Sequence, residues 1–130
     1  MKPVTQTHVG VGNPRANCLM AAIASIVECP IDSLPDVYDH EQRGLDWFGV
    51  LRDALAPHRL VPVIYDQNSK LFPPIAPKGY HVACGTSPRQ DEQHAVVALD
   101  GEIVFDPHPS RDGLRGDVAW WILLIPAAAA

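Results

Sequence analysis

Apolar positions in the first half of the chain recur at helical spacing. Residues 18–28 are apolar on most sides and rich in alanine, which predicts a central, buried helix. Asn17 is a favourable N-cap for this helix, and Pro30 is expected to end it. A narrower apolar stripe at three- and four-residue intervals predicts a second helix over residues 40–55, with one solvated face.

The second half changes to the short apolar runs that are typical of β-strands. Asp100 and Gly101 form a two-residue hairpin signal, which predicts that residues 102–105 fold back antiparallel onto 94–99. Pro62 favours an edge or bulge position in the first strand, because proline cannot donate to a ladder. The predicted strands cover residues 60–65, 80–84, 94–99, 102–105 and 118–125. Helices followed by an antiparallel meander predict a single α+β domain over all 130 residues.

Composition and charge limit the function classes. The chain is 47 % hydrophobic and 19 % charged, which suits a folded domain and argues against disorder. A net charge of −5 without any basic run disfavours nucleic acid as a partner. No apolar run approaches the ~20 residues that span a bilayer, and residues 1–8 lack the apolar core of a secretory signal, so we expect no membrane partner. Three irregularly spaced cysteines support no disulfide framework and favour a reduced, cytoplasmic setting.

Three residue types that together form a nucleophilic site occur far apart in the sequence. Cys18 opens the first predicted helix, where the positive end of the helix dipole favours the thiolate, the reactive form of a cysteine. His94 opens one arm of the predicted hairpin, and Asp106 follows the other. Opposed residues on antiparallel strands have Cβ atoms about 4.5–5.5 Å apart, so Asp106 is expected to reach a His94 ring nitrogen and fix its tautomer. The pattern predicts a Cys-His-Asp triad with His94 as general base.

Other side chains compete for these roles. The alternative to a catalytic role is that Cys18 is a small hydrophobic residue of the core. Packing is the expected role of Cys29 and Cys84. His108, which lies between two prolines, is an alternative to either His94 or Asp106. His94, Asp106 and His108 include zinc-ligand types, but no tight His-X-His or His-Glu-X-X-His spacing occurs. The sequence therefore predicts neither a metal nor a cofactor.

An acyl-transfer cysteine also needs donors for the oxyanion that develops on the substrate. The backbone amide of Cys18, at the helix start, is one candidate. A side-chain amide from the preceding loop is expected to be the second, and Gln6, Asn13 and Asn17 are available. Asn17 is expected to be used in capping. We therefore choose Gln6, although spacing alone does not separate it from Asn13.

Several segments resemble a known superfamily. The sequences NCLMAAIASI at 17–26 and PIDSLP at 30–35 are similar to the nucleophile helix region of papain-like cysteine peptidases, including bacteriocin-processing ones. The resemblance is closest to small, mostly uncharacterised phage and prophage proteins of that fold. It extends to GYHVACGTSPR at 79–89, HAVV at 94–97 and FDPHPS at 105–110, and covers nearly the whole chain.

The resemblance implies a papain-like fold, with Cys18 on an N-terminal helix packed on a small antiparallel sheet that carries His94 and Asp106. It implies a glutamine upstream of the cysteine as oxyanion donor, which maps to Gln6. The implied activity is that of a thiol-dependent hydrolase, a cysteine peptidase or amidase. Its substrate would be a peptide, protein or amide, cleaved through an acyl-enzyme intermediate.

Two alternatives stay open at the level of sequence. The same residues would serve an acyl transferase or a deamidase. A catalytically idle papain-like scaffold of phage origin would instead bind a host protein, with Trp120, Trp121 and the proline-rich segment 71–78 as candidate contacts. A phage-encoded protein of either kind is expected in the host cell cytoplasm.

Overall fold

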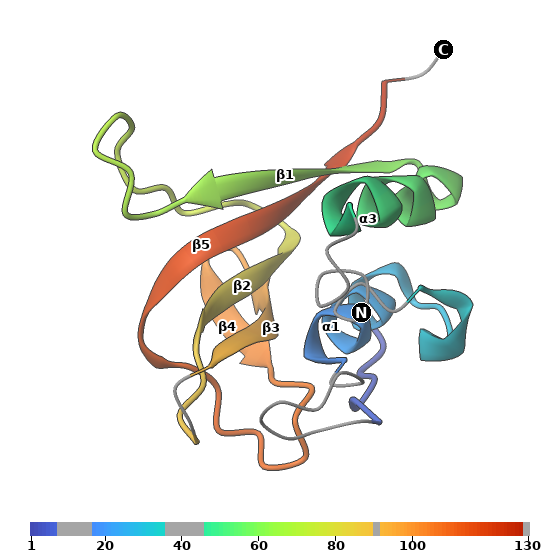
Figure 1. Cartoon of the computed structure of the whole chain (residues 1–130), viewed down its shortest axis with the longest axis horizontal. Coiled ribbons are helices and arrows are strands. Elements are labelled where there is room, and N and C mark those ends of the chain that lie inside the picture. Colours follow the sequence, from blue (N-terminus) through green and yellow to red (C-terminus); the bar gives the residue numbers. More distant parts are fainter. Residues whose placement is uncertain (8–16, 36–45, 90–91, 129–130) are drawn as a thin grey trace.

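The computed structural model describes residues 1–7, 17–35, 46–89 and 92–128. This part of the chain forms two α-helices, two short 3₁₀ helices and one five-stranded antiparallel sheet (Figure 1). In chain order the elements are α1 (Cys18–Val27), η1 (Ile31–Ser33), α3 (Trp47–Leu55), η2 (Ala56–His58), β1 (Leu60–Asp66), β2 (Tyr80–Thr86), β3 (Gln93–Leu99), β4 (Glu102–Phe105) and β5 (Arg115–Pro126). The predicted α+β class is confirmed, with helices first and strands afterwards.

The strands lie in the order β1-β5-β2-β3-β4, and every neighbouring pair is antiparallel. The prediction of a simple meander is therefore wrong, because β5 lies between β1 and β2. With 12 residues, β5 is long enough to pair with both of these strands. The connection 67–79 extends away from the helices (Figure 1) and lets β1 separate from β2. Pro62 lies on the edge strand β1, as predicted.

The tight turn between β3 and β4 forms where the sequence predicts it. Both turn residues have a positive φ, 52° at Asp100 and 87° at Gly101. Such values are typical of a type I′ turn, whose twist matches that of the flanking strands. A register shift within this ladder pairs Val97 with Phe105. Strand β4 consequently ends directly before Asp106.

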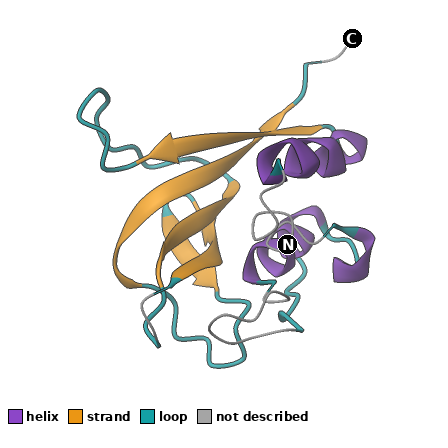
Figure 2. Ribbon diagram, in the orientation of Figure 1, coloured by secondary structure: helices purple, strands orange, loops and turns teal. Residues whose placement is uncertain are grey.

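Both helices pack on the same face of the sheet (Figure 2). Helix α1 lies against β3 and β2, and its residues 20–25 are buried, as expected for a central helix. Helix α3 lies against β1 and begins at Trp47. Asp46 has non-helical backbone angles, and its side chain accepts a hydrogen bond from the Gly49 amide at 2.9 Å. Of the helix expected over 40–55, the part from Trp47 onward is confirmed, with Asp46 as its N-cap, and residues 40–45 lie outside the described part of the chain.

The start of α1 differs from the expectation in one respect. The side chain of Asn17 makes no capping hydrogen bond to the helix, although its backbone carbonyl accepts the first helical bond, from the Ala21 amide at 2.9 Å. Asn17 Oδ1 instead accepts from the Thr7 amide at 3.1 Å, and its Nδ2 donates to Thr7 Oγ1 at 2.9 Å. The side chain of Asn17 thus ties the N-terminal segment to the start of α1.

The core has one part on each face of the sheet. The larger part lies between the helices and the sheet, and the smaller one surrounds Trp121 on the opposite face. Trp121 is only 3 % exposed, and its ring meets that of His81 edge-on, with the centroids 4.9 Å apart. The expectation that Trp121 is a contact for a partner is therefore wrong, because residues of the sheet and of the loops beside it, including Ile75 and Leu114, cover this ring. Trp120 is partly exposed.

Candidate active site

Cys18 is the first residue of α1 and is only partly buried. The unpaired amides of the first turn and the positive end of the helix dipole therefore act on the region around its sulfur. Helix α1 packs on β3 and β2, and Ser25, a buried residue in its third turn, ties the N-terminal segment to it. The Ser25 hydroxyl donates to the Ala21 carbonyl and accepts from the Val4 amide, both at 2.8 Å. The helix start thus presents a thiol at the surface of a rigid element.

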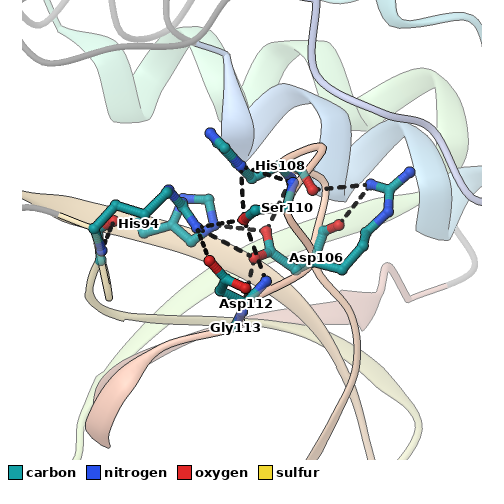
Figure 3. Close-up of polar contacts among 9 residues, drawn as sticks. His94, Asp106, His108, Ser110, Asp112 and Gly113 are labelled. Atoms are coloured by element: carbon teal, nitrogen blue, oxygen red, sulfur yellow. Dashed lines mark hydrogen bonds and ion pairs between the residues drawn. The ribbon is translucent and has the colours of Figure 1, made fainter.

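His94 and Asp106 are in direct contact, as the hairpin geometry predicts. Nε2 of His94 lies 2.6 Å from Oδ1 of Asp106 (Figure 3). Both side chains are almost fully buried, 5 % and 2 % exposed. Burial protects this short contact from competition by water, so the His94 ring is held in one orientation.

The Asp106 carboxylate is held from several sides. Oδ1 also accepts from the His108 amide at 2.9 Å, and Oδ2 accepts from the Gly113 amide at 2.8 Å. Burial alone would raise the pKa of Asp106, but the hydrogen bond from His94, those from the two amides and the imidazolium charge lower it below its usual 3.8. Asp106 is therefore ionised at neutral pH and held by three donors beside the His94 ring.

Cys18 is close enough to the His94 side chain to raise the pKa of its ring. Burial alone would lower the pKa of His94, but hydrogen bonds to Asp106 and Cys18 and the negative charges of both raise it from 6.5 to about 9. The ring is therefore protonated at pH 7. Because Asp106 occupies Nε2, Nδ1 is the ring nitrogen that remains for the sulfur. The structure thus brings together residues 18, 94 and 106, which the sequence singles out.

Gln6 lies beside the same loop and is buried, with 7 % of its surface exposed. Its backbone amide donates to the Pro107 carbonyl at 2.9 Å, so the segment that carries Gln6 is tied to the residue after Asp106. Asn13, the alternative oxyanion donor, lies outside the described residues. Asn17 is engaged by Thr7, as described above. Of the three side-chain amides, Gln6 is thus the one seen next to the Asp106 loop.

The other two cysteines differ from Cys18 in their environment. Cys84 is buried in the core of the sheet, as expected. Burial, and next the charge of Cys18, raise the pKa of the Cys84 thiol well above its usual range, so this thiol stays protonated. Cys29 follows α1 and is partly exposed, and all three cysteines are free thiols. Among the described residues, no group of three or more His, Cys, Asp or Glu side chains is arranged to hold a metal ion.

Polar residues around Asp106 form a network that sequence reasoning missed (Figure 3). Arg89 donates to Ser110 Oγ at 2.8 Å and lies 3.9 Å from Asp106 Oδ2. Arg111 donates to the Asp106 carbonyl at 2.8 Å and to Thr5 Oγ1 at 2.6 Å, which joins the loop to the N-terminal segment. No periodic pattern marks such residues, because they lie in irregular loops that meet only in the folded chain.

His108, the predicted competitor, lies at the edge of the site. Its ring centroid is 6.3 Å from that of His94. The Ser110 amide donates to His108 Nδ1 at 3.0 Å, so this nitrogen is an acceptor and the ring is neutral. Burial and then the charge of Arg89 lower the pKa of His108, which agrees with a neutral ring. His94, and not His108, is the histidine that contacts Asp106 with its ring.

Comparisons with known proteins identify no relative with which this site can be compared. A scan against protein-family models gives no match, and searches of the curated proteins and of the solved structures give no significant match. In the part of the chain that the structure describes, no helix has the length and hydropathy needed to cross a membrane.

Proposed function

We propose that this protein is a thiol-dependent hydrolase of papain-like type, which cleaves a peptide or amide bond through a Cys-His-Asp triad. One observation carries the proposal: the His94 ring contacts the Asp106 carboxylate at one nitrogen and lies within reach of Cys18. A nucleophile, a base and an orienting acid in this order define a triad by geometry and not by position in the chain. A nucleophile helix packed on an antiparallel sheet supports the papain-like type.

His94 carries a proton at neutral pH, because the pKa of this ring is about 9. In the proposed reaction Cys18 is the nucleophile and attacks as the thiolate, the reactive form of a cysteine. The Cys18 sulfur attacks the carbonyl carbon of the substrate, and the π electrons of the C=O bond move onto the carbonyl oxygen. The backbone amide of Cys18 and the side chain of Gln6 stabilise this oxyanion.

Collapse of the tetrahedral adduct breaks the bond to the leaving amine, which receives the proton of His94. A water molecule then attacks the acyl-enzyme while His94 takes up one of its protons, and the thiolate leaves. Asp106 keeps the ring oriented and stabilises its charged form throughout. The same residues would perform acyl transfer or deamidation if an amine replaced water or if the substrate were a side-chain amide.

Selective alkylation tests the proposal. Iodoacetamide at pH 6.5, followed by peptide mapping, should label Cys18 before Cys29 and leave Cys84 unmodified. An ordinary cysteine with a pKa of about 8.5 is only ~1 % thiolate at this pH, so His94→Gln should slow the labelling of Cys18 by between about tenfold and a hundredfold. His58→Gln on η2 is the matched control, because it removes a histidine remote from the triad.

The outcome separates an enzyme from an idle scaffold. Labelling of Cys29 with Cys18 untouched, or equal labelling rates in the two histidine variants, would contradict the triad. In a biological assay, Cys18→Ser should abolish the effect of the protein. Full activity of Cys18→Ser would instead favour a binding role without catalysis.

A further inference from the structure

A second site lies close to the triad. A pocket of about 410 Å³ opens between the N-terminal end of α3 and the ladder of β1 with β5. This volume is within the ~300–1,000 Å³ that is typical of ligand pockets. The pocket is lined by Trp47, Ile64, Asp66, Asn68, Ala119 and Trp120. None of these residues has a role in the triad.

Trp120 connects the pocket to the triad. Its Nε1 donates to Gln93 Oε1 at 3.3 Å, and Gln93 directly precedes His94. Trp120 also pairs with Cys84 on the neighbouring strand β2, and the charge of Cys18 raises the pKa of the Cys84 thiol. Neighbouring strands lie about 4.8 Å apart, so Trp120 on β5 and His94 on β3 are separated by two strand spacings, roughly 10 Å. An extended peptide rises about 3.3 Å per residue, so a side chain one or two residues from the scissile bond can reach the pocket.

The lining of the pocket favours a cation on an apolar stem. Trp47 and Trp120 offer indole rings, whose faces are negative and attract ammonium or guanidinium groups. Asp66 is the charged residue in the lining, and its Oδ1 accepts from the Asn68 amide at 2.8 Å, which fixes the carboxylate. Lysine and arginine combine methylene groups, which pack on apolar walls, with a charged head. An acidic side chain would meet repulsion from Asp66 and from the net charge of −5.

We propose that this pocket binds a lysine or arginine side chain of the peptide substrate, one or two residues from the scissile bond. The inference rests on the proposed hydrolase function, because it assigns the substrate preference of that same site. It makes the protein selective for basic peptides.

Peptidyl vinyl sulfones test the preference without turnover. The Cys18 sulfur adds to the vinyl carbon β to the sulfone, the proton of His94 ends on the α carbon next to the sulfone, and no group leaves. Four probes differ only in one side chain, lysine, arginine, norleucine or glutamate, placed at the first and then at the second position from the sulfone. At one of these positions, the basic probes should label Cys18 about fivefold faster than norleucine, the size expected from one exposed cation–π contact and one exposed ion pair. Glutamate should be slower than norleucine.

Matched variants test whether the pocket causes the preference for basic probes. Asp66→Asn keeps the side-chain size and an acceptor for the Asn68 amide but removes the charge, so it should bring the lysine-to-norleucine rate ratio below about two. Asp53→Asn makes the same charge change on an exposed part of α3 and should leave the ratio unchanged. Trp47→Leu, which keeps an apolar wall without a π face, should also lower the ratio.

Failure of the inference is distinct from failure of the proposed function. Labelling of Cys18 at equal rates by the lysine and norleucine probes at both positions overturns the basic preference and leaves the hydrolase intact. An unchanged ratio in Asp66→Asn also overturns the assignment to this pocket. If no probe labels Cys18 in the folded wild type, the hydrolase proposal fails, and the pocket inference falls with it.

Discussion

Replacing Asp106 by asparagine removes one negative charge and one acceptor from the most densely bonded side chain of the site. In the wild type, Oδ1 accepts from His94 Nε2 and the His108 amide, and Oδ2 accepts from the Gly113 amide. An asparagine has only one side-chain oxygen. The amino group of the asparagine must therefore face at least one donor. This is either the Gly113 amide or the two donors at Oδ1, which are His94 Nε2 and the His108 amide.

The cost follows from these contacts. An unsatisfied buried donor costs about 1–3 kcal/mol, and the contact to His94 loses the strength of a charge-assisted hydrogen bond. We expect Asp106→Asn to lower the free energy of unfolding by about 2–4 kcal/mol at pH 7. The pKa of His94 should fall below about 9, because both the hydrogen bond and the charge of Asp106 raise it.

Urea denaturation at pH 7 measures the first effect, and NMR titration of the His94 ring measures the second. Asp112→Asn is the matched control in the same loop. Its carboxylate is 53 % exposed and lies 3.8 Å from Arg89 Nη1, an exposed contact of little energetic weight. If Asp106→Asn and Asp112→Asn had equal stability and the same His94 titration, the assignment of Asp106 as the orienting carboxylate would be refuted.

Three further predictions concern pH, the oxyanion donor and the docking of the N-terminal segment. Folding raises the pKa of His94 from 6.5 to about 9, so this group stabilises the fold fully below pH 6.5, and ~3 kcal/mol is lost as the pH rises through 9. Urea denaturation between pH 6 and 10 measures the loss, which should be absent from His94→Gln. Gln6→Ala should lower kcat about a hundredfold while the alkylation rate of Cys18 stays the same, because alkylation forms no oxyanion; an equal loss in both assays would speak against an oxyanion role. Ser25→Ala should lower the free energy of unfolding by about 2 kcal/mol, because the Val4 amide loses its acceptor. The exposed hydroxyl of Ser33 serves as the control, and a similar effect of Ser33→Ala would contradict the reasoning.

The sequence was sufficient where contacts are local. Asp100 and Gly101 define the turn, and the turn brings Asp106 to His94, only 12 residues away. Cys18 could be matched to these residues only through its chemistry and the family resemblance, because no local pattern links a helix start to a distant strand. The burial of α1 followed from its apolar residues on most sides.

The remaining features depend on contacts between distant segments. The position of β5 between β1 and β2 is set by the sheet as a whole and not by the order of strands in the chain. The contact of Arg111 with Thr5 joins residues 106 positions apart, and Arg89 meets Ser110 across two loops. Such polar contacts leave no trace in hydrophobic periodicity. The start of α3 at Trp47 depends on Asp46, whose capping role was hidden within a longer apolar stripe.

The hydrogen bonds that hold Asp106 and its loop also determine when the site can form during synthesis of the chain. Its partners include Gly113, and its loop is tied to Thr5 and Gln6 near the start of the chain. A nascent polypeptide whose residue 113 is still inside the ribosomal tunnel lacks one of the three donors that hold the carboxylate. Residues 1–113 must therefore leave the tunnel before the site is complete, and fragments that end before residue 94 would carry the thiol without its partners.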